Sequence, residues 1–180
     1  MGFDLNQSEQ PAQVTAIFEK TTGLDTKDTY SILTSTANTF TEISNLREND
    51  YASRAEAIGD RIHAVQSRYA VDAQALTQGL QNVGANLKAA GNDLDETLSL
   101  ITVANKISPD ADTGNGLLKT ATARLNTETD SAILRQKIYR QTGNQVDILG
   151  DENTLKSTFQ ILTEIGAIFD SLPKTSKRAS

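Results

Sequence analysis

Apolar side chains recur along this chain at spacings of three and four residues, in short segments separated by Gly, Pro, Asn and Asp. An α-helix repeats every 3.6 residues, so this pattern predicts helices rather than strands. We expect an all-α fold of six to seven short amphipathic helices, arranged as a helical bundle or as an elongated array of helical hairpins. The segments that carry the pattern are Ser8 to Gly23, Thr26 to Ser44, Glu48 to Tyr69, Asp72 to Gly91, Leu94 to about Lys106, Thr113 or Asn115 to Leu125, Asp130 to Thr142 and Leu155 to Leu172.

The clearest helix is the one that Asp72 caps and Gly91 ends. Its apolar stripe repeats at four, three and four residues: Leu76, Leu80, Val83 and Leu87. Gly79 and Gly84 lie inside this helix, although each costs about 1 kcal/mol relative to Ala, so we expect a neighbouring helix to approach closely there. The following helix begins after Asn92 or Asp93, and the two should form a hairpin.

The other segments carry apolar stripes of the same kind, which we expect to be buried. In chain order they are Val14, Ile17 and Phe18; Tyr30, Leu33, Ala37, Phe40 and Ile43 or Thr41; Tyr51, Ala55, Ile58, Ile62 and Val65; Leu98, Ile101 and Val103; Leu117, Leu118, Ala121 and Leu125; Ile133, Leu134 and Ile138; and Leu155, Phe159, Leu162 and Phe169 beside Ile161, Ile165 and Ile168. Residues 110–116 are expected to form a loop, and residues 146–149 a short extended segment before a turn at 150–153.

The length of 180 residues suits one structural unit. Within it we expect an N-terminal helical segment over 1–69, core helices over 70–128, C-terminal helices over 129–172 and a basic flexible tail over 173–180. Aromatic residues make up 5% of the chain and Trp is absent, so the core must be built from aliphatic side chains. The net charge of −6 argues against nucleic-acid recognition, which needs clustered Lys and Arg.

Each candidate for chemistry has a simpler structural interpretation. Asp110, Asp112 and Gly114 resemble the start of a calcium loop, but Asn115 stands where such a loop needs Gly, and Ala121 where it needs a bidentate Glu. Gly114 and Gly116 match half of a nucleotide-binding fingerprint, with no strand before them. A loop that opens a helix explains both patterns.

The remaining titratable residues also lack partners for catalysis. His63 is the single histidine and the chain has no Cys, so neither a zinc site nor a thiol nucleophile is expected. Asp93, Asp95 and Glu96 fall in the first turn of a helix, where the helix dipole favours negative charge. We therefore expect no catalytic, cofactor-binding or metal-binding residues, no cofactor and no enzyme activity.

Two blocks of the chain resemble the core region of bacteriophage tail tape measure proteins. The first runs from Val71 to Leu125 and contains GLQNVGANLKAAGNDLDETLSLITVAN, over residues 79–105, and GLLKTATARL, over residues 116–125. The second comprises residues 146–149 and LKSTFQILTEIGAIFDSL, over residues 155–172. Phe159 and Phe169 stand where that family often has Tyr and Trp. Residues 1 to about 60 match loosely.

The resemblance implies a viral structural protein of a phage or prophage tail, acting in tail assembly and length determination and in genome delivery. It implies the other tail proteins as partners, namely tube, tail tip or baseplate and assembly chaperones, with self-association as a further option. The implied location is the virion tail, in the tube lumen or at the tip, and the host cytoplasm during assembly. Because Gly and Pro interrupt the pattern, we expect a compact module rather than one uninterrupted helix.

Two alternatives remain. In the first, the amphipathic last helix lies in the interface of the host membrane, with Lys174, Lys177 and Arg178 at the lipid headgroups, and helps to penetrate the host envelope. The most apolar window, residues 161–172, is too short to span a bilayer. In the second, less favoured alternative, the chain is a cell-wall-degrading enzyme domain, although it lacks the usual catalytic constellations.

Overall fold

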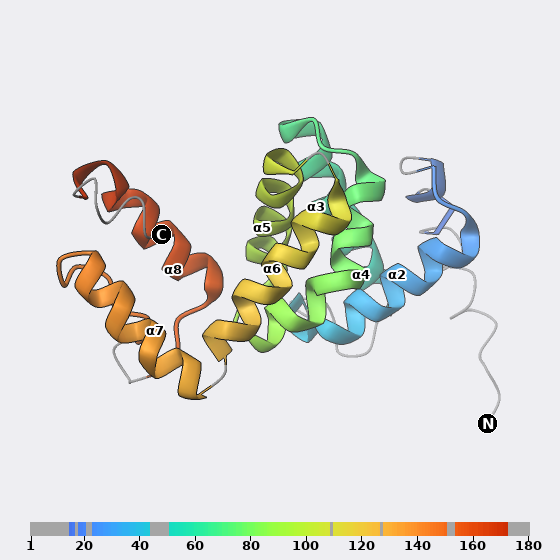
Figure 1. The fold of residues 1–180 in the computed structure, drawn as a ribbon. Helices are drawn as coiled ribbons and strands as arrows, with labels where there is room; N and C mark the ends of the chain where they lie inside the picture. Colours follow the sequence, from blue (N-terminus) through green and yellow to red (C-terminus); the bar gives the residue numbers. More distant parts are fainter. Residues whose placement is uncertain are drawn as a thin grey trace, which may run out of the picture.

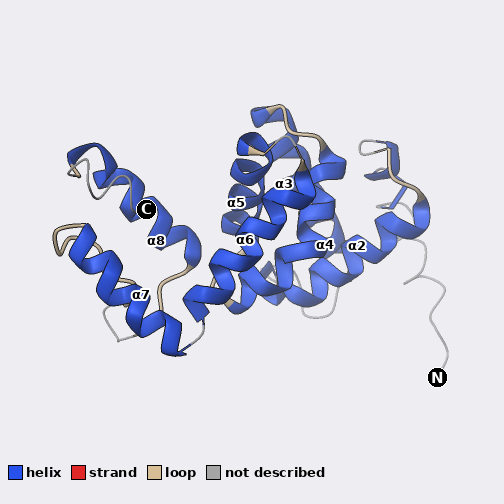
Figure 2. Cartoon of the chain, in the orientation of Figure 1, coloured by secondary structure: helices blue, strands red, loops and turns tan. Residues whose placement is uncertain are grey.

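The computed structural model shows an all-α chain, and it describes residues 15–16, 18–20, 23–43, 51–108, 110–126, 128–150 and 154–172 (Figures 1 and 2). The elements are α2 (Thr26–Thr39), η1 (Thr41–Ile43), α3 (Tyr51–Tyr69), α4 (Ala73–Ala89), α5 (Leu94–Ile107), α6 (Ala111–Asn126), α7 (Glu128–Gln141), α8 (Thr158–Ile168) and η2 (Phe169–Ser171). Residues 15–16 and 18–20 are also helical. The predicted fold class is confirmed.

Helices α2 to α6 pack together into what we call the bundle, while α7 and α8 lie to one side of it, beyond the end of α6 (Figure 1). The bundle is built on aliphatic side chains, because the chain has few aromatic residues. Leu33, Ile58, Leu76, Leu98 and Ile101 belong to its core and are fully buried. Phe18 and Phe40 supply its aromatic part.

The predicted hairpin of α4 and α5 is confirmed. The side chain of Asp72 caps α4 by accepting a hydrogen bond from the Gln74 N–H. Gly91 follows the helix with a φ of +79°, and the N–H groups of Gly91 and Asn92 donate to Lys88 and Leu87 at 3.0 and 3.1 Å. This left-handed cap reverses the chain and satisfies the last carbonyls of α4.

The expected close approach at Gly79 is confirmed, since a Cβ there would overlap Cγ2 of Ile101 on α5. Gly84 differs: a Cβ would meet the Phe40 ring at 3.7 Å, an ordinary contact, so the prediction of a close approach there is wrong. A second close approach lies at Gly114, where a Cβ would stand 3.0 Å from the Ala104 carbonyl oxygen of α5.

Several side chains that were expected to be buried face solvent. Tyr30 is 52% exposed, because α2 turns Thr29, Ile32 and Leu33 toward the core instead. Val103 is 53% exposed, and Thr102 takes the buried position beside it. A threonine can take such a position where its hydroxyl bonds within its own helix, as that of Thr102 does to the Leu98 carbonyl at 2.7 Å.

The expected loop over residues 110–116 is wrong, because α6 begins at Ala111. Helix α6 turns Gly114, Asn115, Thr122 and Leu125 inward and leaves Leu117 and Ala121 exposed. A face made of Gly, Asn and Thr carries a weak hydrophobic signal, so the apolar residues indicated the wrong side of this helix.

The described residues between α7 and α8 agree with the extended segment expected over 146–149. Gly143 and Asn144 end α7 with φ values of +64° and +66°. Leu149 then pairs with Leu155 in an isolated antiparallel bridge. Leu155 therefore lies before α8 and not on its apolar stripe, which corrects the expected start of the last helix.

The buried side of α8 consists of Thr158 and Ile161, with Ile165 partly buried. Leu162 and Phe169, expected in the buried stripe, are exposed, as is Ile133 on α7. These side chains face outward because α8 and α7 pack on the rest of the molecule along one side only.

A few expectations fall on residues outside those that the structure describes. They are the start of the first helix at Ser8, the burial of Val14, Ile17 and Tyr51, the helix-ending Pro109, most of the turn at 150–153, and the basic tail over 173–180.

Candidate functional site

The carboxylate of Asp110 begins helix α6. It accepts hydrogen bonds from the Thr113 hydroxyl at 2.5 Å, the Thr113 N–H at 3.2 Å and the Asp112 N–H at 3.3 Å. These bonds, above all that from the Thr113 hydroxyl, hold the pKa of Asp110 below its usual range. Asp112 in turn accepts a hydrogen bond from Gln78 Nε2 of α4 at 3.0 Å. Both acidic residues of the calcium-like motif thus serve helix start and helix packing.

Gly114 and Gly116, the pair that matches half of a nucleotide-binding fingerprint, lie inside α6 rather than in a phosphate-binding loop. Gly114 packs against the backbone of Ala104, and Asn115 is 2% exposed. Both amide atoms of Asn115 are buried, so neither faces a ligand from solvent. Gly114 permits close helix packing, whereas a Cβ at Gly116 would meet no neighbouring atom within 4 Å.

The acidic cluster at the start of α5 forms a capping box, which confirms its placement in the first turn of a helix. Asp93 Oδ1 accepts from the Glu96 N–H at 2.7 Å, and Glu96 Oε2 accepts from the Asp93 N–H at 3.3 Å. Asp95 pairs with Arg61 Nε of α3 at 3.0 Å. Of the two proposed caps, Asn92 and Asp93, the cap is Asp93.

His63 lies on the exposed side of α3. Among the residues that the structure describes, no three His, Cys, Asp or Glu side chains gather in the way that a metal ion would require. The candidates for chemistry therefore remain dispersed over separate helix starts and surfaces.

Asn92 has a role that the sequence analysis missed. Its side chain is fully buried and bridges the α4–α5 turn to the start of α8. Nδ2 donates to the Leu87 carbonyl at 2.7 Å, and Oδ1 accepts from the Phe159 N–H at 3.0 Å. The signal available in the sequence was an Asn directly after the helix-ending Gly, but nothing there indicated a partner 67 residues away.

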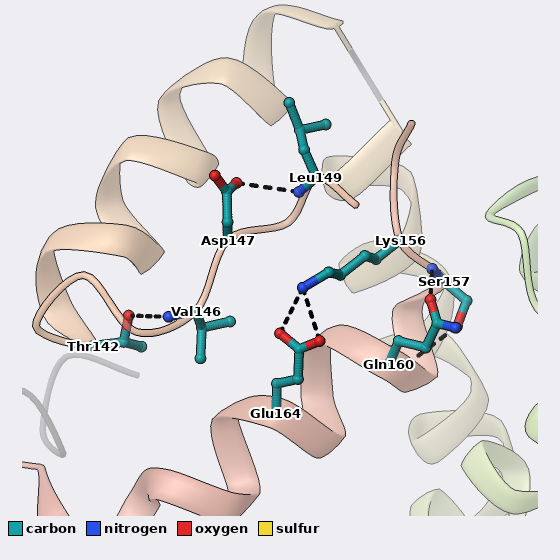
Figure 3. Close-up of polar contacts among 8 residues, drawn as sticks. All are labelled: Thr142, Val146, Asp147, Leu149, Lys156, Ser157, Gln160 and Glu164. Atoms are coloured by element: carbon teal, nitrogen blue, oxygen red, sulfur yellow. Dashed lines mark hydrogen bonds and ion pairs between the residues drawn. The ribbon is translucent and has the colours of Figure 1, made fainter. Parts of the chain in front are cut away.

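Residues 128–172, comprising α7, the extended segment and α8, are called here the arm (Figure 1). Polar contacts order its connecting segment. In Figure 3, the Thr142 side chain accepts a hydrogen bond from the Val146 N–H, and the Asp147 side chain accepts one from the Leu149 N–H. Lys156 Nζ pairs with both carboxylate oxygens of Glu164, at 2.8 Å each. Ser157 caps α8 in a capping box with Gln160.

A groove of about 550 Å³ lies between α7 and the extended segment. Ala132, Arg135, Gln136 and Tyr139 line it from α7, and Asp147, Ile148, Leu149 and Leu155 from the other side. Arg135 and Asp147 cross it with two bonds of 2.7 Å, and this partner lowers the pKa of Asp147 to about 2. The groove combines an ion pair with apolar walls and offers no nucleophile or acid–base pair.

The surface of the arm carries exposed apolar side chains, among them Ile133, Leu162 and Phe169. Among the described residues, no helix has the length and apolar content needed to cross a membrane. These side chains are suited to protein contacts or to lying on a surface.

Comparison with known proteins gives one assignment. A family model described as phage-related minor tail protein matches residues 1–180. No solved structure matches the chain.

Proposed function

Because the chain belongs to the phage-related minor tail protein family, we propose that it is a structural and assembly module of a tail tape measure protein. Membership of that family makes it a component of a phage tail that associates with other tail proteins, and the family is generally non-catalytic. In the proposed role the module takes part in tail assembly and in setting tail length.

One observation carries the proposal: the chain folds back on itself. Among the residues that the structure describes, the longest helix is α3, with 19 residues, or roughly 28 Å at 1.5 Å per residue. As one continuous helix, residues 70–172 alone would reach roughly 150 Å. Since α4, α5 and α6 pack against one another around a buried core, the module contributes a folded surface to the tail rather than length along the tube.

The test separates a folded module from an extended ruler. In a phage that carries this gene, Leu98→Asp places a charge in the core and leaves the number of residues unchanged, while Val103→Asp places the same charge on the exposed side of α5. Deletion of residues 70–172 completes the set. Tails are counted and measured by negative-stain electron microscopy, and infectivity by plaque titre.

We expect Leu98→Asp to reduce the yield of complete tails as strongly as the deletion does, and Val103→Asp to leave yield and length unchanged. If the deletion shortens the tails while Leu98→Asp leaves them normal, the segment acts through its contour length. If all three phages assemble and infect normally, the assembly role is wrong.

Exposed Leu162 and Phe169 on one side of α8 and η2 favour a second candidate, a helix that lies on the host membrane. Co-sedimentation with vesicles containing anionic lipid tests it, with Leu162→Ser/Phe169→Ser as the variant. Binding that disappears in this variant would support the second candidate, and a protein that stays in the supernatant would exclude it.

A further inference from the structure

The described residues form two separate apolar clusters. The larger one fills the bundle and draws on α2 to α5. The smaller one has three buried members, Leu125, Ile148 and Ile161, with Leu134, Ile138, Leu149 and Ile165 packed around them. Apart from Leu125, at the end of α6, these side chains belong to the arm. The arm therefore has a small apolar cluster of its own, to which the bundle contributes Leu125.

The second connection between arm and bundle lies around the turn after α4 and includes contacts between α8 and α5. The start of α8 meets this turn: a Cβ on Gly91 would lie 3.7 Å from the Ser157 Cα, and the Phe159 N–H donates to Asn92. Phe159 is partly buried against the main cluster at the same place. Figure 1 shows the rest of α8 running away from the bundle.

Asn92 suits this junction because both polar atoms of its side-chain amide, Nδ2 and Oδ1, make hydrogen bonds. Nδ2 is held by the Leu87 carbonyl, which fixes the side chain to the end of α4 and points Oδ1 at α8. The first N–H groups of a helix have no partner within it, and Ser157 satisfies that of Gln160. Asn92 supplies the partner for Phe159, and an Ala at this position would leave that N–H without one.

We propose that Asn92 is a latch, and that the arm opens from the bundle as a unit when the bond between Asn92 and Phe159 breaks, while the bundle stays folded. The latch joins residues far apart in sequence through one side chain, whereas most apolar contacts of each part lie within its own cluster. It belongs to the chain alone, so it stands or falls independently of the role in tail length. After opening, the bundle stays folded while the arm can move away from it.

The absence of Cys makes the movement measurable in the full chain. Spin labels on Gln81→Cys in α4 and Thr163→Cys in α8, both exposed sites, report the distance between bundle and arm by double electron–electron resonance. The test variant is Asn92→Ala. The matched control is Asn86→Ala, which removes an exposed side-chain amide from α4.

We expect one narrow distance distribution in the unchanged chain and in Asn86→Ala, and a broader, longer one in Asn92→Ala. Hydrogen exchange gives the second readout. The Phe159 amide should exchange at least about tenfold faster in Asn92→Ala, as the loss of its hydrogen bond requires, while the Val83 and Leu87 amides in α4 keep their protection.

Three results would overturn the latch. An unchanged distance distribution in Asn92→Ala would show that other contacts hold the arm. A broad distribution in the unchanged chain would show that the arm is not held. Loss of protection at Val83 and Leu87 in Asn92→Ala would mean that Asn92 supports the hairpin itself, so that the arm is not a separable unit.

Discussion

Replacement of Gly79 by Ala tests how closely α4 and α5 pack. In the middle of a helix, Ala is more stable than Gly by about 1 kcal/mol, so the substitution would stabilise an unpacked site. Here the new Cβ would overlap Ile101 Cγ2 and lie 3.2 Å from both Cγ1 and Cδ1 of the same side chain. Ile101 is fully buried and Cγ2 is bonded directly to its Cβ, so it moves only if the helix moves or the β-branched side chain leaves its preferred χ1 rotamer. Overpacking of this kind costs about 1–3 kcal/mol, which outweighs the gain in helix propensity.

Gly116→Ala is the matched control, because Gly116 lies inside α6 and a Cβ added there would meet no neighbouring atom within 4 Å. Chemical denaturation followed by circular dichroism should show Gly116→Ala stabilised by about 0.5–1 kcal/mol and Gly79→Ala destabilised by about 1 kcal/mol. Ile101→Leu removes the branch that the new Cβ would overlap, so it should recover part of the loss in the double variant. Equal stabilisation by the two alanines would refute the close approach.

Three further predictions follow from burial, capping and charge. Leu98→Ala should lower the free energy of unfolding by about 2–5 kcal/mol and Val103→Ala by less than about 0.5 kcal/mol, and equal losses in denaturation would contradict the orientation of α5. Asp93→Ala should cost about 1 kcal/mol through the lost capping box, and a thermal melt that does not change would argue against that cap. The pKa of the Asp147 carboxyl should be about 2 by NMR titration, and higher, toward its usual 3.8, in Arg135→Gln. Because the pKa of Asp147 is lowered in the folded protein, the Asp147–Arg135 pair stabilises the fold above pH 3.8, and this stabilisation is lost as the pH falls toward 2. An Asp147 pKa that does not change in Arg135→Gln would exclude this pair as the cause of the shift.

The helical architecture follows from the sequence because spacing and helix ends are local properties. The α4 stripe, the Asp72 cap and the Gly91 turn depend on residues within one or two turns of each other, and all are predictable from them. The close approach at Gly79 is also predictable, since an interior Gly is costly in a helix unless another element needs the space.

The sequence did not reveal which side of each weakly apolar helix is buried. Thr29 and Thr102 are buried through bonds or packing that hydrophobicity does not record, whereas Tyr30 and Val103 face solvent. In α6, the same preference for apolar residues placed Leu117 inside, because a Gly at position 114 packs through its backbone and adds no hydrophobic signal.

The junction at Asn92 was beyond sequence reasoning for a different reason. Its partner, the Phe159 N–H, is a backbone group, and no residue type in α8 identifies it. A contact between a side chain and a distant backbone leaves no pattern in a single sequence, so it appears only once the helices are placed in space.

Small-angle X-ray scattering of the full chain, with its helix content checked by circular dichroism, tests most directly whether this protein is a folded module. A compact domain of 180 residues has a radius of gyration of about 16 Å, and an arm beside the bundle raises this to roughly 20 Å. We predict a value in that range together with a strongly helical spectrum. A helical spectrum combined with the scattering of a rod, and a radius of gyration above roughly 40 Å, would contradict the folded module and favour an extended ruler.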